Sequence, residues 1–198
     1  MIAICDHNTA GNVAAVQEAA AGRLAVLAGI EVTTAEEIHV VGIFPDIEAA
    51  EDVGRKVQAA LPPRARAVPR LLSAGCALGL AEAVALIHGH GGLAVAAHVD
   101  RPSYSVVSQL GIFPQGAGFD AVEVSAAGAR RNAECGVRNA EWKSRVGIPA
   151  ALPVLCGSDA HSLEELGGGR TLLDVDEPGF AGLRRALSQG GVRGWRYA

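Results

Sequence analysis

The sequence predicts an α/β protein built around one parallel sheet or barrel, and three observations support this prediction. Hydrophobic residues make up 49% of the 198 residues but aromatic residues only 4%, so the core is expected to consist of small aliphatic side chains. Short apolar runs alternate with Ala-rich segments of helical spacing, an order typical of βαβ units. No internal repeat and no long linker divides the chain, so we expect one domain over residues 1–198.

Six short apolar runs are predicted to be strands, because each has the length of a buried strand and is bounded by Gly or polar residues. In chain order they cover residues 2–5, 24–27, 39–44, 93–97, 121–124 and 154–156. The second run is expected to end at Gly29-Ile30-Glu31. The polar residues that end these runs are therefore candidates for a site at one edge of the sheet.

The segments between the runs are predicted to be helices. In chain order these helices cover residues 12–21, 47–60, 80–88, 104–110, 139–146 and 182–187. Asn12 is a suitable N-cap for the first helix, and Pro62-Pro63 ends the second because proline cannot continue a helix. The basic stretch 64–70 is expected to be a connection.

Charge and composition exclude several classes of protein. The net charge of −4 gives no general attraction for long nucleic acid, and the clusters of Arg and Lys are expected to be solvated surface. No apolar run reaches the roughly 20 residues of a membrane span, and no export signal is visible, so we expect a cytoplasmic protein. The four scattered cysteines (Cys5, Cys76, Cys135 and Cys156) contain no C-x-x-C pair, which favours reduced thiols.

Polar residues of metal-ligand type follow or open most of the predicted strands. These residues are His7, Glu31, His39, His98, Asp159 and His161. The strand ends of an α/β sheet or barrel meet at one mouth, and imidazoles with carboxylates suit Zn²⁺, Mn²⁺ or Fe²⁺. No G-x-S-x-G elbow and no P-loop competes with a metal site.

Each residue also has a structural interpretation. A single histidine at a strand end is more often a hydrogen-bonded structural residue, whereas Glu31 and Asp159 are equally compatible with caps of the following helices. His88 and His90 are expected to interact with a helix C-terminus rather than with a metal. Arg101 follows His98 closely and has two interpretations, a fork for a phosphate or a surface ion pair.

Four segments resemble the motifs of the PHP domain, the polymerase and histidinol phosphatase superfamily of metal-dependent phosphoesterases. They are "AICDHNTAGN" (3–12), "GIEVTTAEEIHVVGIFPD" (29–46), "GGLAVAAHVDR" (91–101) and "GSDAHS" (157–162). The resemblance implies a distorted seven-stranded β/α barrel with two to three divalent ions at its C-terminal mouth. It further implies a histidinol phosphatase-like hydrolase, in which a metal-activated hydroxide attacks the phosphate ester of a small molecule or nucleotide.

The resemblance also assigns roles by position. Glu31 resembles a glutamate that bridges two ions, with His39 and His98 beside it on one ion. Asp159 resembles a ligand of a second ion, and His7 and His161 resemble ligands of a third. Arg101 is the residue expected to hold the phosphate.

The chain departs from the family pattern at its N-terminus, because no H-x-H motif precedes His7. The first β/α unit of the barrel is therefore expected to be missing, with fewer ions than in a complete member and an exposed apolar strand edge. Three explanations stay open: a true start further upstream, a homo-oligomer formed through the gap, and a non-catalytic scaffold that binds a metabolite or partner. A nuclease acting on short oligonucleotides is a further alternative function.

Overall fold

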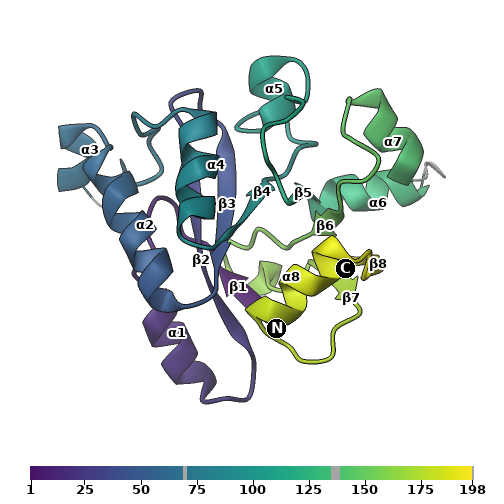
Figure 1. The fold of residues 1–198 in the computed structure, drawn as a ribbon, viewed down its shortest axis with the longest axis horizontal. Helices are drawn as coiled ribbons and strands as arrows, with labels where there is room; N and C mark the ends of the chain where they lie inside the picture. Colours follow the sequence, from purple (N-terminus) through teal and green to yellow (C-terminus); the bar gives the residue numbers. More distant parts are fainter. Residues whose placement is uncertain (69–70, 135–138, 198) are drawn as a thin grey trace.

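The computed structural model describes residues 1–68, 71–134 and 139–197. Six strands form one sheet in the order β1-β2-β3-β4-β5-β6, and two more form a hairpin, β7-β8. The strands of the main sheet are β1 (Ile2–Ile4), β2 (Val26–Thr33), β3 (His39–Phe44), β4 (Leu93–Ala96), β5 (Ala121–Val124) and β6 (Val154–Cys156). The sheet is curled and open, like part of a barrel (Figure 1). The α/β class is confirmed, but the described sheet has six strands rather than the expected seven.

The strand β3 differs from the expected parallel arrangement, because it runs antiparallel to both β2 and β4. The connection from Thr34 to Ile38 is too short for a crossover, so β2 and β3 can pair only as a hairpin. The reversal brings His39, the first residue of β3, level with the C-terminal end of β2, where it pairs with Thr33. The mouth therefore receives the start of β3 together with the ends of its neighbours.

The strand β2 is longer than predicted. It continues through Gly29 and Ile30 to Thr33, so Glu31 lies inside the strand instead of following it. The reason is the pairing with β3, which extends to the end of the hairpin. The alternation of side chains along the strand then decides which face Glu31 occupies.

The helices agree largely with the prediction. Their bounds are α1 (Val13–Ala20), α2 (Ile47–Ala59), α3 (Pro63–Ala67), α4 (Leu80–Gly89), α5 (Val106–Leu110), α6 (Ala126–Glu134), α7 (Asn139–Arg145) and α8 (Phe180–Ser188). Helix α3 lies in the basic stretch that was expected to be a connection, because Pro63 can occupy the first turn of a helix. Helix α6 and the hairpin of β7 (Gly169–Leu173) and β8 (Val192–Tyr197) were not predicted.

Two apolar clusters cover the two faces of the sheet. The larger cluster packs the sheet against α2 and α4, and includes Ile30, Phe44 and Val122. The smaller cluster lies on the opposite face, where Leu27, Leu93 and other strand residues contact Leu183 and Leu187 of α8. Because side chains alternate, Glu31 shares the face of Leu27, the inner face of the curled sheet.

Strand β1 is the edge of the main sheet and pairs with β2 alone among the described strands. Ile2 and Leu24 beside this edge are 36% and 42% exposed. They line an open groove together with side chains of α1. The expected exposed apolar edge is therefore present. None of the described helices has both the length and the hydropathy needed to cross a bilayer.

Candidate metal centre

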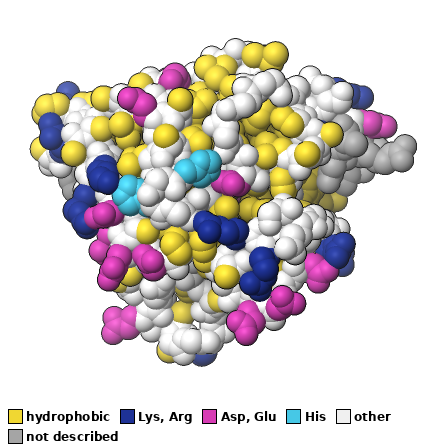
Figure 2. Space-filling view, in the orientation of Figure 1, with side chains coloured by type: hydrophobic (Ala, Val, Ile, Leu, Met, Phe, Trp, Pro, Cys, Tyr) yellow, Lys and Arg dark blue, Asp and Glu magenta, His cyan; other side chains and the backbone are white. Residues whose placement is uncertain are grey.

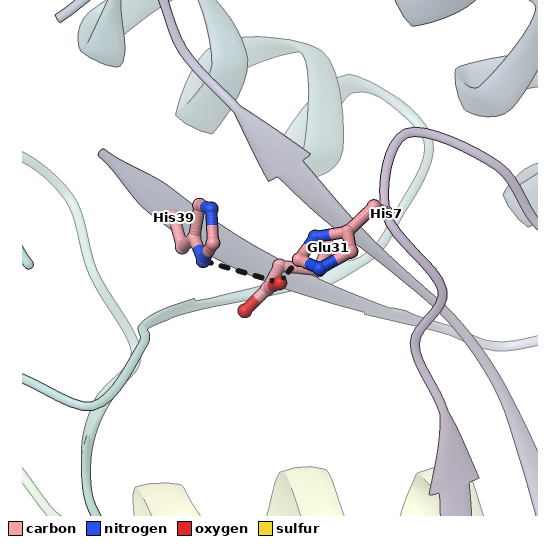
Figure 3. Close-up of side chains that lie close together, drawn as sticks. All are labelled: His7, Glu31 and His39. Carbon is pink, nitrogen blue, oxygen red and sulfur yellow. Dashed lines mark ion pairs between the residues drawn. The ribbon is translucent and has the colours of Figure 1, made fainter. Parts of the chain in front are cut away.

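The candidate metal centre is built around the carboxylate of Glu31, which is 6% exposed. Its Oε2 lies 2.8 Å from His7 Nδ1 and 3.2 Å from His39 Nδ1, and its Oε1 lies 3.6 Å from His98 Nε2. Figure 3 shows His7 and His39 pointing toward this carboxylate from separate segments of the chain. Four of the six predicted ligands thus meet in one place.

The geometry of this cluster suits a cation. Within the described chain, one set of three ligand-type residues has donor atoms all within 4.8 Å of one another: His7, Glu31 and His39. His7 Nδ1 is close to Glu31 but is not aligned for a hydrogen bond, and the buried His39 Nε2 and His98 Nδ1 have no hydrogen-bond partner among the described residues. Imidazole nitrogens and a carboxylate oxygen that converge in this way are the donor set that divalent transition metals prefer.

The charges of the cluster are strongly coupled. Burial by itself would raise the pKa of the Glu31 carboxyl, but contacts with His39, His7 and His98 outweigh burial and hold this pKa well below its ordinary value. The close contact with the Glu31 carboxylate raises the pKa of His7, against the opposing effect of burial. Burial lowers and Glu31 raises the pKa of His98, with a net upward shift. Glu31 is therefore held in its ionised form, the form that can bind a cation.

The backbone around the ligands is held in uncommon conformations. His98 (φ 25°) and Asp159 (φ 47°) have positive φ, as do Asn8 (φ 54°) directly after His7 and Tyr104 (φ 56°). The Tyr104 ring stacks on His39, with ring centroids 4.7 Å apart, and the carbonyl of Tyr104 accepts the His39 N–H at 2.8 Å. Such strained residues are common at functional sites, where surrounding contacts must hold them.

Asn8 is the main support of the His7 loop, and it is fully buried. Its side-chain oxygen accepts the Thr33 N–H at 2.9 Å, while its amide donates to the carbonyls of Leu72 and Ala74 at 2.5 and 2.9 Å. The Asn8 N–H donates to the Glu31 carbonyl at 2.7 Å. These contacts fix the position of His7 relative to Glu31.

Glu123 is a residue of the site that the sequence analysis did not identify. It lies on β5, and its Oε2 accepts the N–H of His98 at 3.3 Å. Burial raises the pKa of Glu123 to about 7, against the opposing effect of the His98 charge and N–H. An acidic residue inside the apolar run "AVEV" was the signal that could have identified it.

Asp159 and His161 form a neighbouring group rather than part of the Glu31 cluster. The Asp159 carboxylate contacts the guanidinium of Arg101, and the His161 ring lies 6.0 Å from the His7 ring between centroids. Arg101 thus forms an ion pair with a predicted metal ligand. The roles of these three residues stay predictions.

The remaining histidines have structural contacts: as expected, His90 Nδ1 lies 2.8 Å from the carbonyl of Leu86 near the C-terminus of α4, whereas His88 pairs with an acidic side chain. His88 Nε2 lies 2.9 Å from Asp120 Oδ2, and His90 Nε2 lies 2.9 Å from Lys56 Nζ. Cys5, Cys76 and Cys156 are free thiols. Cys135 lies outside the described residues.

Comparison with known proteins finds a family that matches one segment of the chain. Residues 142–192 match a family model described as PHP-associated. Through this segment the chain is similar to proteins of the PHP superfamily. The sequence has no significant match among curated proteins.

Solved structures share the fold of this chain. A lesion-specific endonuclease from Pyrococcus furiosus superposes with a TM-score of 0.59 at 18% identity, over 84% of this chain and 40% of that chain. An amidohydrolase from Chromobacterium violaceum, solved with sulfate and no metal, has a TM-score of 0.57 at 23% identity, over 84% and 79% of the two chains. A protein assigned as a metal-dependent phosphoesterase, from Bifidobacterium adolescentis, has a TM-score of 0.52 at 20% identity, over 81% and 77%. The chain spans 40% of the length of the endonuclease.

Proposed function

We propose that this chain is a metal-dependent phosphoesterase that hydrolyses a small phosphorylated molecule. The observation that carries the proposal is the Glu31 carboxylate, buried and contacted by the imidazoles of His7, His39 and His98 at 2.8, 3.2 and 3.6 Å. A purely structural glutamate needs neither three imidazoles nor buried ring nitrogens without partners. Zn²⁺, Mn²⁺ or Fe²⁺ suits this donor set.

The residues of the chain have separate roles in this proposal. Glu31, His7, His39 and His98 hold the cation, and Asp159 and His161 extend the site toward a second or third ion. A bound divalent ion supplies positive charge for the phosphoryl oxygens and lowers the pKa of water. Arg101, paired with Asp159, binds a phosphate oxygen, because a guanidinium matches phosphate geometry.

The proposal is tested by metal content and hydrolysis of p-nitrophenyl phosphate. Glu31→Ala and His98→Ala are expected to lose bound metal and turnover together. His88→Ala is the matched control, because His88 pairs with Asp120 away from the Glu31 cluster. Unchanged turnover in both site variants would refute the assignment. Less than one tightly bound transition metal per unchanged chain would favour the non-catalytic scaffold.

A nuclease is the second candidate function, favoured by the fold shared with the Pyrococcus furiosus endonuclease. The net charge of −4 disfavours a long nucleic acid as substrate, so we expect short oligonucleotides if this function applies. Cleavage of an end-labelled oligonucleotide that is lost in Glu31→Ala, with no release of nitrophenol from p-nitrophenyl phosphate, would favour it.

A further inference from the structure

A cavity of about 410 Å³ lies between α5 and α6. Its lining includes Val99, Arg101, Pro102, Val107, Gly128 and Arg131. Most of the lining comes from the segments that follow β4 and β5, two adjacent parallel strands, and Val146 after α7 completes it. Figure 2 shows hydrophobic side chains gathered between α5 and the α6–α7 region. The cavity therefore opens on the side of the sheet where the predicted metal ligands lie.

Arg101 joins this cavity to the candidate metal centre. The Arg101 guanidinium contacts the Asp159 carboxylate, and the backbone N–H of Arg101 donates to the carbonyl of His98 at 2.9 Å. The loop that contains Arg101 also carries Tyr104, which stacks on His39. A molecule whose phosphate lies at the Glu31 cluster can therefore extend its remaining part past Arg101 into the cavity.

The second arginine of the cavity, Arg131, is available to a ligand. Its side chain is 66% exposed, and its carboxylate neighbour is Asp100, at 3.7 Å from Nη2 to Oδ2. Asp100 is already engaged, because its two oxygens accept the N–H and hydroxyl of Ser125 at 2.7 and 2.6 Å. The Arg131 guanidinium thus retains donors that can bind an anion.

Part of the cavity wall is apolar, whereas Asp100, Ser108 and the two arginines supply its polar groups. Val99, Val107 and Val146 line the apolar part together with Pro102. A volume of about 410 Å³ falls at the lower end of the range for small-molecule sites, roughly 300–1,000 Å³. The cavity therefore suits one ring-sized organic group rather than a polymer.

We propose, on the basis of the function proposed above, that this cavity binds the alcohol part of the substrate. The apolar part of the wall contacts the organic body of that alcohol, and Arg131 pairs with a second anionic group that it carries. The substrate class is thus a phosphate ester of a small organic alcohol with one further negative charge. Arg101 lies between the two charged groups.

A matched pair of substrates tests this proposal: phenyl phosphate and para-carboxyphenyl phosphate, which differ by one carboxylate. In Arg131→Ala the kcat/KM ratio of the second substrate to the first is expected to fall about tenfold, the effect of losing one charge-assisted pair. Arg130→Ala is the control, because Arg130 is exposed and is not part of the lining. The same ratio in Arg131→Ala and in the unchanged chain would overturn the cavity assignment while leaving the phosphoesterase intact.

Binding of para-carboxyphenylphosphonate, followed by calorimetry in the presence of Mn²⁺, decides the question independently of turnover. The dissociation constant is expected to rise about tenfold in Arg131→Ala and to stay unchanged in Arg130→Ala. Equal affinity in all three proteins, or no binding to the unchanged chain, would overturn the proposal. Binding that follows the expected pattern without hydrolysis of either ester would refute the phosphoesterase but retain the site.

Discussion

Replacement of Asn8 by Ala is expected to destabilise the chain by about 4 kcal/mol. The side chain is fully buried and makes three hydrogen bonds, to Thr33, Leu72 and Ala74. At about 1 kcal/mol for each bond, these contribute about 3 kcal/mol. The left-handed conformation of residue 8 (φ 54°) adds about 1 kcal/mol for Ala, which tolerates it less well than Asn.

The assay is urea unfolding of the metal-free chain, with the free energy of unfolding obtained by linear extrapolation. Asn8→Gly removes the same three hydrogen bonds but accepts positive φ, so it is expected to be about 1 kcal/mol more stable than Asn8→Ala. Asn12→Ala is the matched control: its hydrogen bond to Asp6 is exposed, and its loss is expected to cost less than about 0.5 kcal/mol. A loss below 1 kcal/mol in Asn8→Ala would show that the Asn8 contacts do not support the His7 loop.

Three further predictions follow from the site and the core. Glu31→Gln removes the charge that raises the pKa of His7, so an NMR titration of the metal-free variant should give a lower His7 pKa than in the unchanged chain. An unchanged His7 pKa would contradict the contact between His7 and the Glu31 carboxylate. Gly157→Ala should weaken metal binding about tenfold or more, as measured by equilibrium dialysis. The new Cβ would lie 2.0 Å from Glu123 Oε1 and would displace this carboxylate from the backbone N–H of His98. Equal metal affinity would mean that Glu123 does not position His98. Burial raises the pKa of the Cys156 thiol to about 11, so between about pH 9 and 11 the folded thiol keeps a proton that the unfolded thiol loses. The free energy of unfolding should therefore fall as pH rises over this range, by at most about 1.4 kcal/mol per pH unit. An equally steep fall in Cys156→Ala would exclude this thiol as the cause.

The sequence by itself determined the strands of the main sheet, most of the helices and the ligand types of this protein. Apolar runs of strand length predicted β3, β5 and β6 at their observed bounds, because buried strands require continuous aliphatic residues. Histidines and acids next to these runs predicted His7, Glu31, His39 and His98 as members of one cluster. Local patterns were sufficient for His7 and His98, because they follow β1 and β4 and the ends of strands that run in the same direction meet at one edge of an α/β sheet.

Only the tertiary structure decided the direction of β3, the face of Glu31 and the role of Glu123. The hairpin of β2 and β3 reverses β3, so His39 reaches the mouth from the start of its strand and not from its end. Glu123 appeared as one polar residue within an apolar run, and its contact with the His98 N–H joins residues that are separated by a helix in the chain. Pairing register and the contacts between distant segments depend on packing across the whole sheet, and one-dimensional patterns do not contain that information.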